Sequence, residues 1–412
     1  MVYNKEKKGG DEFVPSIEIK PGIYWIGVND HTTDLFEGLW PITQEGVSYN
    51  SYLLLDEKKV IIDLAKSLKV DEYLGRLEEL TDIATIDYIV LNHLEPDHTG
   101  ILKILFRMAE KAIIFCSPQA KEMVSAFYNI HDRIQVVKDG EELSLGEKKI
   151  RFYLTPMVHW PETMMTYEVN TQILFSCDAF GGYGALQGAI FDDECSDFEF
   201  YKRESLRYYA NIVAKFSPMV LRAIDKLSSL EVSIIAPSHG LIWRQRPSLI
   251  VDLYRTWANS VQNGGEKRVT VVYGSMYGNT EAMMDALAQG VASSGISVEI
   301  FDVRRNHCSY ILPALLMSKG VVVGAPTYEN ALFPYMVNLL DLALRKELKH
   351  KKVLYFGSFG WSGGAKREFE KMAHQLDWEI VQSFEFRGAG TEEDFQKIIA
   401  LGREFGESVK GL

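Results

Sequence analysis

The first half of the chain consists of short apolar runs separated by polar turn residues. Residues 23–28, 52–55 and 60–63 have the short alternating pattern of strands, and residues 70–80 have apolar positions at helical spacing. The apolar run 86–91 predicts a buried strand. Further patterns predict strands at 112–116, 134–137, 149–154, 164–169, 171–176 and 233–236, and helices at 101–109, 120–128, 204–216 and 221–227. This order predicts sheets packed together with helices outside.

The second half begins after a polar, glycine-containing break at 263–267 and has a different texture. Strands and helices now alternate regularly, which is typical of a doubly wound parallel sheet. The patterns predict strands at 269–273, 298–302, 320–324 and 353–357, and helices from 280 and at 334–344 and 365–375. We therefore predict two domains, 1–264 and 265–412.

Composition narrows the class of protein. The chain has 412 residues with a net charge of -12, and this acidic balance disfavours a nucleic-acid binder. No apolar window approaches the length of a membrane span, and the polar N-terminus lacks the apolar core of a signal peptide, so we expect a cytoplasmic protein. The four cysteines form no CxxC pair, which disfavours a rubredoxin-like or zinc-ribbon site.

A cluster of metal-type side chains follows the predicted strand 86–91. The stretch 91–100, LNHLEPDHTG, holds four of them, and Pro96 and Gly100 make it a tight loop. Three more stand where later strands are expected to end, so they can converge on the same rim. Each one alone could be an ordinary loop or core residue, but imidazole and carboxylate groups together suit divalent transition metals. The candidates are His93, Glu95, Asp97, His98, His159, Asp178 and His239.

Three loops of the second half have the composition of an anion-binding and ring-binding site. Residues 275–280 open a helix, and hydroxyl groups at a helix N-terminus favour a phosphate. This loop is neither a Walker loop nor GxGxxG. The other two loops follow strands 320–324 and 353–357, at the carboxyl edge where ligands bind in open α/β sheets. The candidates are Ser275, Met276, Tyr277, Gly278, Asn279, Thr280, Pro326, Thr327, Tyr328, Asn330, Ser358, Phe359, Gly360, Trp361, Ser362 and Gly363.

The metal-type set resembles that of the metallo-β-lactamase fold, which uses an HxHxDH loop and a later His, Asp and His. Glu95 stands where that motif has its second histidine. A carboxylate there adds negative charge and a hard oxygen donor, which favours iron over zinc. The HxExD loop, HWPET at 159–163, SCDAFGGYG at 176–184 and SHG at 238–240 resemble the flavodiiron proteins, and the loop 275–280 resembles the FMN-phosphate loop of flavodoxins.

The resemblance covers nearly the whole chain and implies its fold and cofactors. The expected fold is a metallo-β-lactamase-like αββα sandwich followed by a flavodoxin-like doubly wound parallel sheet. The expected cofactors are FMN, with Tyr328 and Trp361 packed on its ring, and two non-haem irons bridged by Asp178. The iron ligands that the resemblance implies are His93, Glu95, Asp97, His159, Asp178 and His239.

Three further residues are assigned to the site by the resemblance alone. The side chain of His98 is expected to turn away from the metals, so that His98 lies near them without being a ligand. His31 and Tyr208 are expected near the open face of the site. These three are the catalytic candidates.

The implied activity is that of an oxidoreductase. FMN is expected to take electrons from an external donor, such as rubredoxin or a reduced deazaflavin, and to pass them to a diiron centre that reduces O₂ to water, NO to N₂O, or both. No rubredoxin or flavin-reductase motif follows the flavodoxin-like part. The family pattern also implies a head-to-tail homodimer or a dimer of dimers. The sequence leaves open the preferred gas, the donor and the number of subunits.

Two other classes remain as alternatives. A hydrolase of the metallo-β-lactamase fold would use a bound-water nucleophile on two zincs. Glu95 and the flavin loops disfavour it, because hydrolysis needs no electrons. A flavodoxin-type electron carrier with a purely structural metal domain is disfavoured by the number of metal-type residues. Metal analysis separates all three classes.

Overall fold

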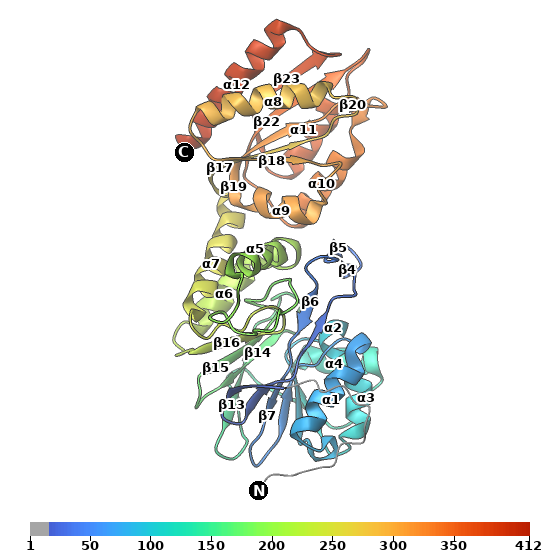
Figure 1. Ribbon diagram of the computed structural model, residues 1–412, viewed down its shortest axis with the longest axis vertical. Coiled ribbons are helices and arrows are strands. Elements are labelled where there is room, and N and C mark those ends of the chain that lie inside the picture. Colours follow the sequence, from blue (N-terminus) through green and yellow to red (C-terminus); the bar gives the residue numbers. More distant parts are fainter. Residues whose placement is uncertain (1–15) are drawn as a thin grey trace. The chain divides into compact units, whose positions relative to one another are not determined.

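The computed structural model describes residues 16–412, and contacts group the chain into two compact units (Figure 1). The first unit runs up to Asp34 and continues with Ile42–Lys202 and Leu227–Ile250. The second unit consists of Leu35–Pro41, Arg203–Lys226 and Val251–Leu412. The domain boundary near residue 264 stays a prediction.

The first unit is built on two β-sheets. A seven-stranded sheet has the order β1-β2-β7-β8-β9-β10-β11, and a five-stranded sheet has the order β12-β13-β14-β15-β16. The strands of the first sheet are β1 (Ile17–Lys20), β2 (Ile23–Trp25), β7 (Tyr52–Leu54), β8 (Val60–Ile62), β9 (Tyr88–Leu91), β10 (Ile113–Cys116) and β11 (Ile134–Val136). Those of the second are β12 (Glu142–Ser144), β13 (Lys149–Leu154), β14 (Met164–Glu168), β15 (Ile173–Cys177) and β16 (Ile234–Pro237). A short ladder pairs β3 (Val28–Asp30) with β6 (Val47–Tyr49).

One apolar core joins the two sheets of the first unit. Trp25 and Val90 of the first sheet and Phe152 and Phe175 of the second belong to the same buried cluster, so the sheets pack face to face. The helical elements of this unit are η1 (Ser67–Lys69), α1 (Val70–Leu80), η2 (Ile83–Thr85), α2 (Pro96–Thr99), α3 (Leu102–Met108) and α4 (Pro118–Tyr128). Loops of polar residues follow the ends of β9 and β15.

The second unit contains a parallel sheet of order β18-β17-β19-β22-β23. Its strands are β17 (Glu266–Tyr273), β18 (Val298–Asp302), β19 (Ser318–Gly324), β22 (Lys352–Phe359) and β23 (Glu379–Arg387). Its helices are α8 (Asn279–Ser293), α9 (Cys308–Met317), α10 (Pro334–Arg345), α11 (Ala365–Gln375) and α12 (Glu392–Lys410). Two small ladders pair β20 (Thr327–Tyr328) with β21 (Ala331–Leu332) and β4 (Leu35–Phe36) with β5 (Trp40–Pro41).

Helices near the unit boundaries complete the fold. They are α5 (Phe198–Tyr208), the π-helical turn η3 (Tyr209–Val213), η4 (Ala214–Phe216), α6 (Ser217–Leu227) and α7 (Pro247–Asn263). The helix predicted at 204–216 is therefore α5 continued by turns of different pitch. Within the described part of the chain, none of the helices has the length and apolar character needed to cross a bilayer.

Candidate functional sites

The metal-type loop is held in place by buried hydrogen bonds at the end of β9. The backbone N–H of Asn92 donates to Asp63 Oδ1 at 2.7 Å, and its side-chain amide donates to Asp63 Oδ2 at 3.0 Å. Pro96 then begins α2, a position where its missing N–H is tolerated. Since Glu95 immediately precedes this helix, the loop residues and the first helical turn present their side chains to one spot.

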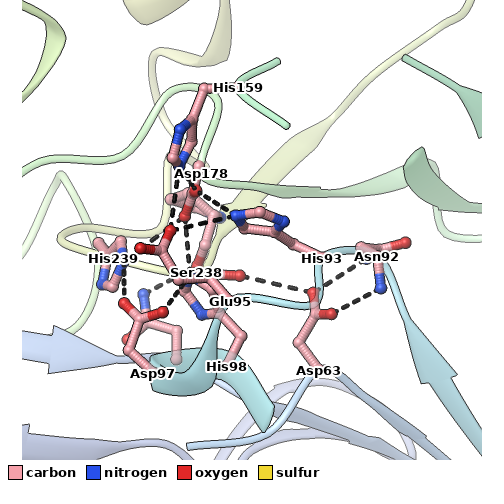
Figure 2. Close-up of polar contacts among 12 residues, drawn as sticks. Asp63, Asn92, His93, Glu95, Asp97, His98, His159, Asp178, Ser238 and His239 are labelled. Carbon is pink, nitrogen blue, oxygen red and sulfur yellow. Dashed lines mark hydrogen bonds and ion pairs between the residues drawn. The ribbon is translucent and has the colours of Figure 1, made fainter. Parts of the chain in front are cut away.

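The first group of side chains combines residues from three loops (Figure 2). Glu95 Oε2 lies 3.3 Å from His93 Nε2 and 3.2 Å from His159 Nε2. Asp178 Oδ2 lies 3.0 Å from His159 Nε2 and 3.4 Å from His93 Nε2. Two imidazole nitrogens and two carboxylate oxygens thus surround one point.

The second group lies against the other oxygen of Asp178. His98 Nε2 lies 2.9 Å from Asp178 Oδ1, and His239 Nε2 lies 3.5 Å from the same oxygen. Asp97 Oδ2 is 3.3 Å from His239 Nε2, and Asp97 Oδ1 is 3.5 Å from His98 Nε2. Asp178 therefore faces one group with each carboxylate oxygen, which is the geometry that a carboxylate bridging two cations requires.

The charges of the cluster favour binding of cations. Burial opposes the charged imidazole, but hydrogen bonds to Glu162 and Glu95 outweigh it and raise the pKa of His93 to about 10. For His159, burial is likewise outweighed by hydrogen bonds to Asp178 and Glu95, and its pKa is raised to about 10. Burial works against ionisation of Asp178, yet the neighbouring His98 and His159 hold its pKa well below the usual range. These carboxylates stay negative, and metal ions can replace the imidazole protons that now balance them.

Burial of the carboxylate oxygens in the cluster also fits the binding of two metal ions. Both oxygens of Asp97 and Oδ2 of Asp178 are buried, and among the described residues the imidazole nitrogens named above approach them without well-aligned hydrogen bonds. Such groups normally have a partner, because an unsatisfied buried oxygen is costly. Nitrogen and oxygen ligands in two adjoining groups suit first-row transition metals such as iron.

The three catalytic candidates are placed differently. His98 is buried in the second group and faces Asp178, so the expectation that it turns away differs from the structure. His31 is exposed in the first unit. Tyr208 is buried in the second unit, where its ring packs edge-on against Phe36. The roles of His31 and Tyr208 stay predictions.

Glu162 is a residue of the metal cluster that the sequence patterns do not single out. Its Oε1 lies 2.6 Å from His93 Nδ1 and accepts the backbone N–H of Leu94 at 3.0 Å. Its sequence signal was its place in the HWPET stretch, two residues before β14. Its contact joins residues far apart in sequence, so the local pattern could not reveal it.

The predicted flavin residues line one pocket of about 410 Å³ in the second unit. All of them contribute to its walls except Gly278 and Gly363, and Glu329 and Gly388 join them. Tyr277 and Trp361 are 90% and 89% exposed, which leaves two large aromatic faces at this pocket. A flat ring with one polar tail suits such a site.

The phosphate-type end of the pocket is the turn between β17 and α8. Gly278 has a φ of +93° at the start of α8, a left-handed conformation that favours glycine. Its N–H donates to Ser275 Oγ at 3.1 Å, and Thr280 Oγ1 lies 2.9 Å from Ser358 Oγ. Arg304 donates to the carbonyl of Ser275 and is itself ion-paired with Asp302 and Glu281, so its role is to fix the turn. Hydroxyls, N–H groups and the helix N-terminus together fit a phosphate group.

Each half of the chain matches a known family model. A model described as ODP family beta lactamase matches residues 47–240, and the flavodoxin model matches residues 271–402. The chain is 37% identical over 395 residues to an anaerobic nitric oxide reductase flavorubredoxin of Escherichia coli, covering 94% of this chain and 81% of that protein.

Solved structures extend the likeness to the whole fold. Rubredoxin oxygen:oxidoreductase from Desulfovibrio gigas has a TM-score of 0.91 at 29% identity, covering 96% of this chain and 99% of that one. The flavodiiron protein from Giardia intestinalis has the same score and identity, with 98% of each chain covered. A mutant form of the flavo di-iron protein from Thermotoga maritima reaches 0.87 at 32% identity, covering 96% and 98%.

The fold and the two sites define a flavoprotein that carries a β-lactamase-like metal domain. The chain belongs to the flavodiiron protein family. This confirms the predicted fold class, the assignment to oxidoreductases, and FMN with non-haem iron as cofactors. The particular ligands and flavin contacts stay predictions, which the geometry above supports.

Proposed function

We propose that this chain reduces O₂ to water, NO to N₂O, or both, with electrons that pass through FMN. The observation that carries the proposal is the division of the metal-type side chains into two groups that share Asp178. A hydrolase would need no flavin, whereas this chain has a flavodoxin domain with an open pocket. Relatives described as a nitric oxide reductase and as a rubredoxin oxygen:oxidoreductase support both gases as substrates.

Each group of ligands has a defined task in this proposal. In this proposal His93, Glu95 and His159 would hold one iron, Asp97 and His239 would hold the other, and Asp178 would be a ligand of both. When bound, the irons supply the redox chemistry for the diatomic substrate. Four carboxylate oxygens close to the pair offset the positive charge that increases when iron is oxidised. His98 steadies Asp178 through the 2.9 Å contact to its Oδ1.

The flavin pocket positions FMN by its two ends. The residues of the turn 275–280 bind the phosphate, and the aromatic faces of Tyr328 and Trp361 pack on the ring. Met276 and Tyr277 lie on the same wall. Glu329 brings a carboxylate to the pocket, which disfavours a further negative charge on the ring.

Electrons enter from a separate donor, for which we propose rubredoxin, with a reduced deazaflavin as the other candidate. We place the protein in the cytoplasm.

Analysis of the purified protein tests the proposed function. We expect one FMN and two irons per chain, and consumption of O₂ or NO only when a reduced donor is supplied. Zinc in place of iron, with hydrolytic activity, would instead identify the metallo-β-lactamase-type hydrolase. Absence of both metals would point to the electron carrier. Gas consumption measured separately with O₂ and NO, and with each donor, decides the preferred substrate and partner.

We also propose that the protein works as a head-to-tail homodimer or a dimer of dimers, in which FMN of one chain serves the irons of the other. The exposed Tyr277 and Trp361 at the flavin pocket support a partner surface there. A two-fold pair makes two composite sites from one repeated contact.

Complementation between two inactive variants tests this assembly. Asp178→Asn removes the bridging ligand, and Thr280→Asp disturbs the phosphate turn, so each variant alone should be inactive. Co-expression with different affinity tags isolates the mixed dimer. We expect it to have about half of the wild-type gas consumption, because one of its two composite sites is intact. A verified mixed dimer without activity, or a fully active wild-type monomer, would refute the proposed assembly.

A further inference from the structure

One imidazole of the metal cluster, that of His93, contacts the carboxylate of Glu162. Glu162 is 1% exposed and lies in the turn before β14. Its Oε1 contacts His93 Nδ1 at 2.6 Å and is also fixed by the N–H of Leu94. The turn is attached to the metal loop, since Met164 N–H donates to the carbonyl of Asn92 at 3.0 Å. Glu162 is therefore held in place by the same loop that carries His93.

The direction of this contact follows from the chemistry of the two groups. A carboxylate only accepts hydrogen bonds, so His93 Nδ1 carries the hydrogen. The other nitrogen, Nε2, faces Glu95 and Asp178, and it can offer its electron pair to a metal ion that replaces the proton there. A carboxylate behind a ligating imidazole fixes its tautomer and makes it a stronger electron donor.

The imidazoles of the second group are held differently at Nδ1. His239 Nδ1 lies 2.7 Å from the carbonyl oxygen of Ser48, which is neutral. His98 Nδ1 is buried and has no hydrogen-bond partner among the described residues. The two sides of Asp178 therefore differ in electron donation, although each offers imidazole and carboxylate groups.

We propose that Glu162 is a positioning residue that makes the two irons unequal, so that the iron held by His93, Glu95 and His159 is oxidised first. This inference rests on the proposed function, because it assumes the ligand groups given above. The negative charge behind His93 stabilises the ferric ion relative to the ferrous ion on that side. In an oxidative titration, one electron leaves this iron for a soluble mediator, and the hydrogen between His93 and Glu162 stays in place.

Glu162→Gln separates the charge from the shape of the residue. Glutamine keeps an oxygen that can accept from His93 Nδ1, but it has no charge. We expect the ferric-to-ferrous ratio of this iron at a fixed potential to fall about tenfold, a rise of about 59 mV in its midpoint potential. In Mössbauer spectra of the half-oxidised full-length protein, the ferric ion should be distributed more evenly over the two iron sites in the variant than in the wild type. A purely structural role predicts iron loss without a shift in the retained centre.

Glu168→Gln is the matched control. Glu168, the last residue of β14, is also a buried glutamate, but its carboxylate accepts the backbone N–H groups of Lys149, Asn170 and Thr171. This control should leave the potentials unchanged. Glu162→Asp keeps the charge at a longer distance and should give a smaller rise, and it provides the test if the Gln variant binds too little iron.

The outcomes separate this inference from the proposed function. Wild-type protein without iron would contradict the proposed function itself. Iron-loaded Glu162 variants with the same potentials and spectra as wild type would refute the inference while leaving the proposed function intact. A rise of equal size in Glu168→Gln would refute it too, since the effect would then not depend on contact with His93.

Discussion

Asp178→Asn is expected to weaken binding of the metal pair and to lose nearly all reduction of O₂ and NO. The two oxygens of Asp178 face both ligand groups, His93 with His159 on one side and His98 with His239 on the other. An amide has the same size but no negative charge, so it bridges two cations poorly. Loss of partners behind a metal ligand already costs about 10–100-fold in affinity or activity. We therefore expect gas consumption to fall at least about 100-fold.

Iron and flavin contents measured together give this prediction its specificity. The variant should contain less than half of the wild-type iron but a full complement of FMN, because the flavin pocket belongs to the other unit. Asp192→Asn is the control for loss of a buried carboxylate. Asp192 accepts the backbone N–H groups of Arg244, Gln245 and Arg246 in the same unit, and its variant should retain iron. Wild-type iron and turnover in Asp178→Asn would contradict the bridging role.

Thr280→Asp is expected to lose FMN while keeping iron. Thr280 lines the flavin pocket in the first turn of α8. A carboxylate there repels the phosphate, and like charges about 4 Å apart near a protein surface repel by about 4 kcal/mol. This corresponds to roughly 10³-fold weaker binding. A negative charge near a helix N-terminus stabilises the helix itself, so the variant should still fold.

Flavin absorbance of the purified variant, and titration of the apoprotein with FMN, measure this effect. Thr280→Ser keeps the hydroxyl that contacts Ser358 and should bind FMN almost as the wild type does. Thr280→Asp should retain its iron but take no electrons from the donor. Yellow protein with normal affinity in Thr280→Asp would show that the phosphate does not bind at this turn.

Local patterns were sufficient for the framework of both units. Strand β18 and helix α11 have the predicted bounds 298–302 and 365–375. Several elements were not predicted, among them α7, α9, β23 and α12, although α7 and α12 are amphipathic. Helix α9 contains Pro313, which a sequence pattern treats as a break. Tertiary packing decides such segments, because buried contacts outweigh weak local preferences.

The sequence by itself determined which chemical groups are available and where strands end. Motif spacing predicted the metal-type residues and the flavin loops, because those residues follow directly on strands. Only the tertiary structure decided which groups meet. His98 and Asp178 are 80 positions apart, and His93 and Glu162 are 69 apart, yet each pair is in contact. These loops come together because the two sheets pack on one core. Hydrophobic periodicity describes only neighbouring positions in the sequence, so it cannot predict contacts between residues so far apart.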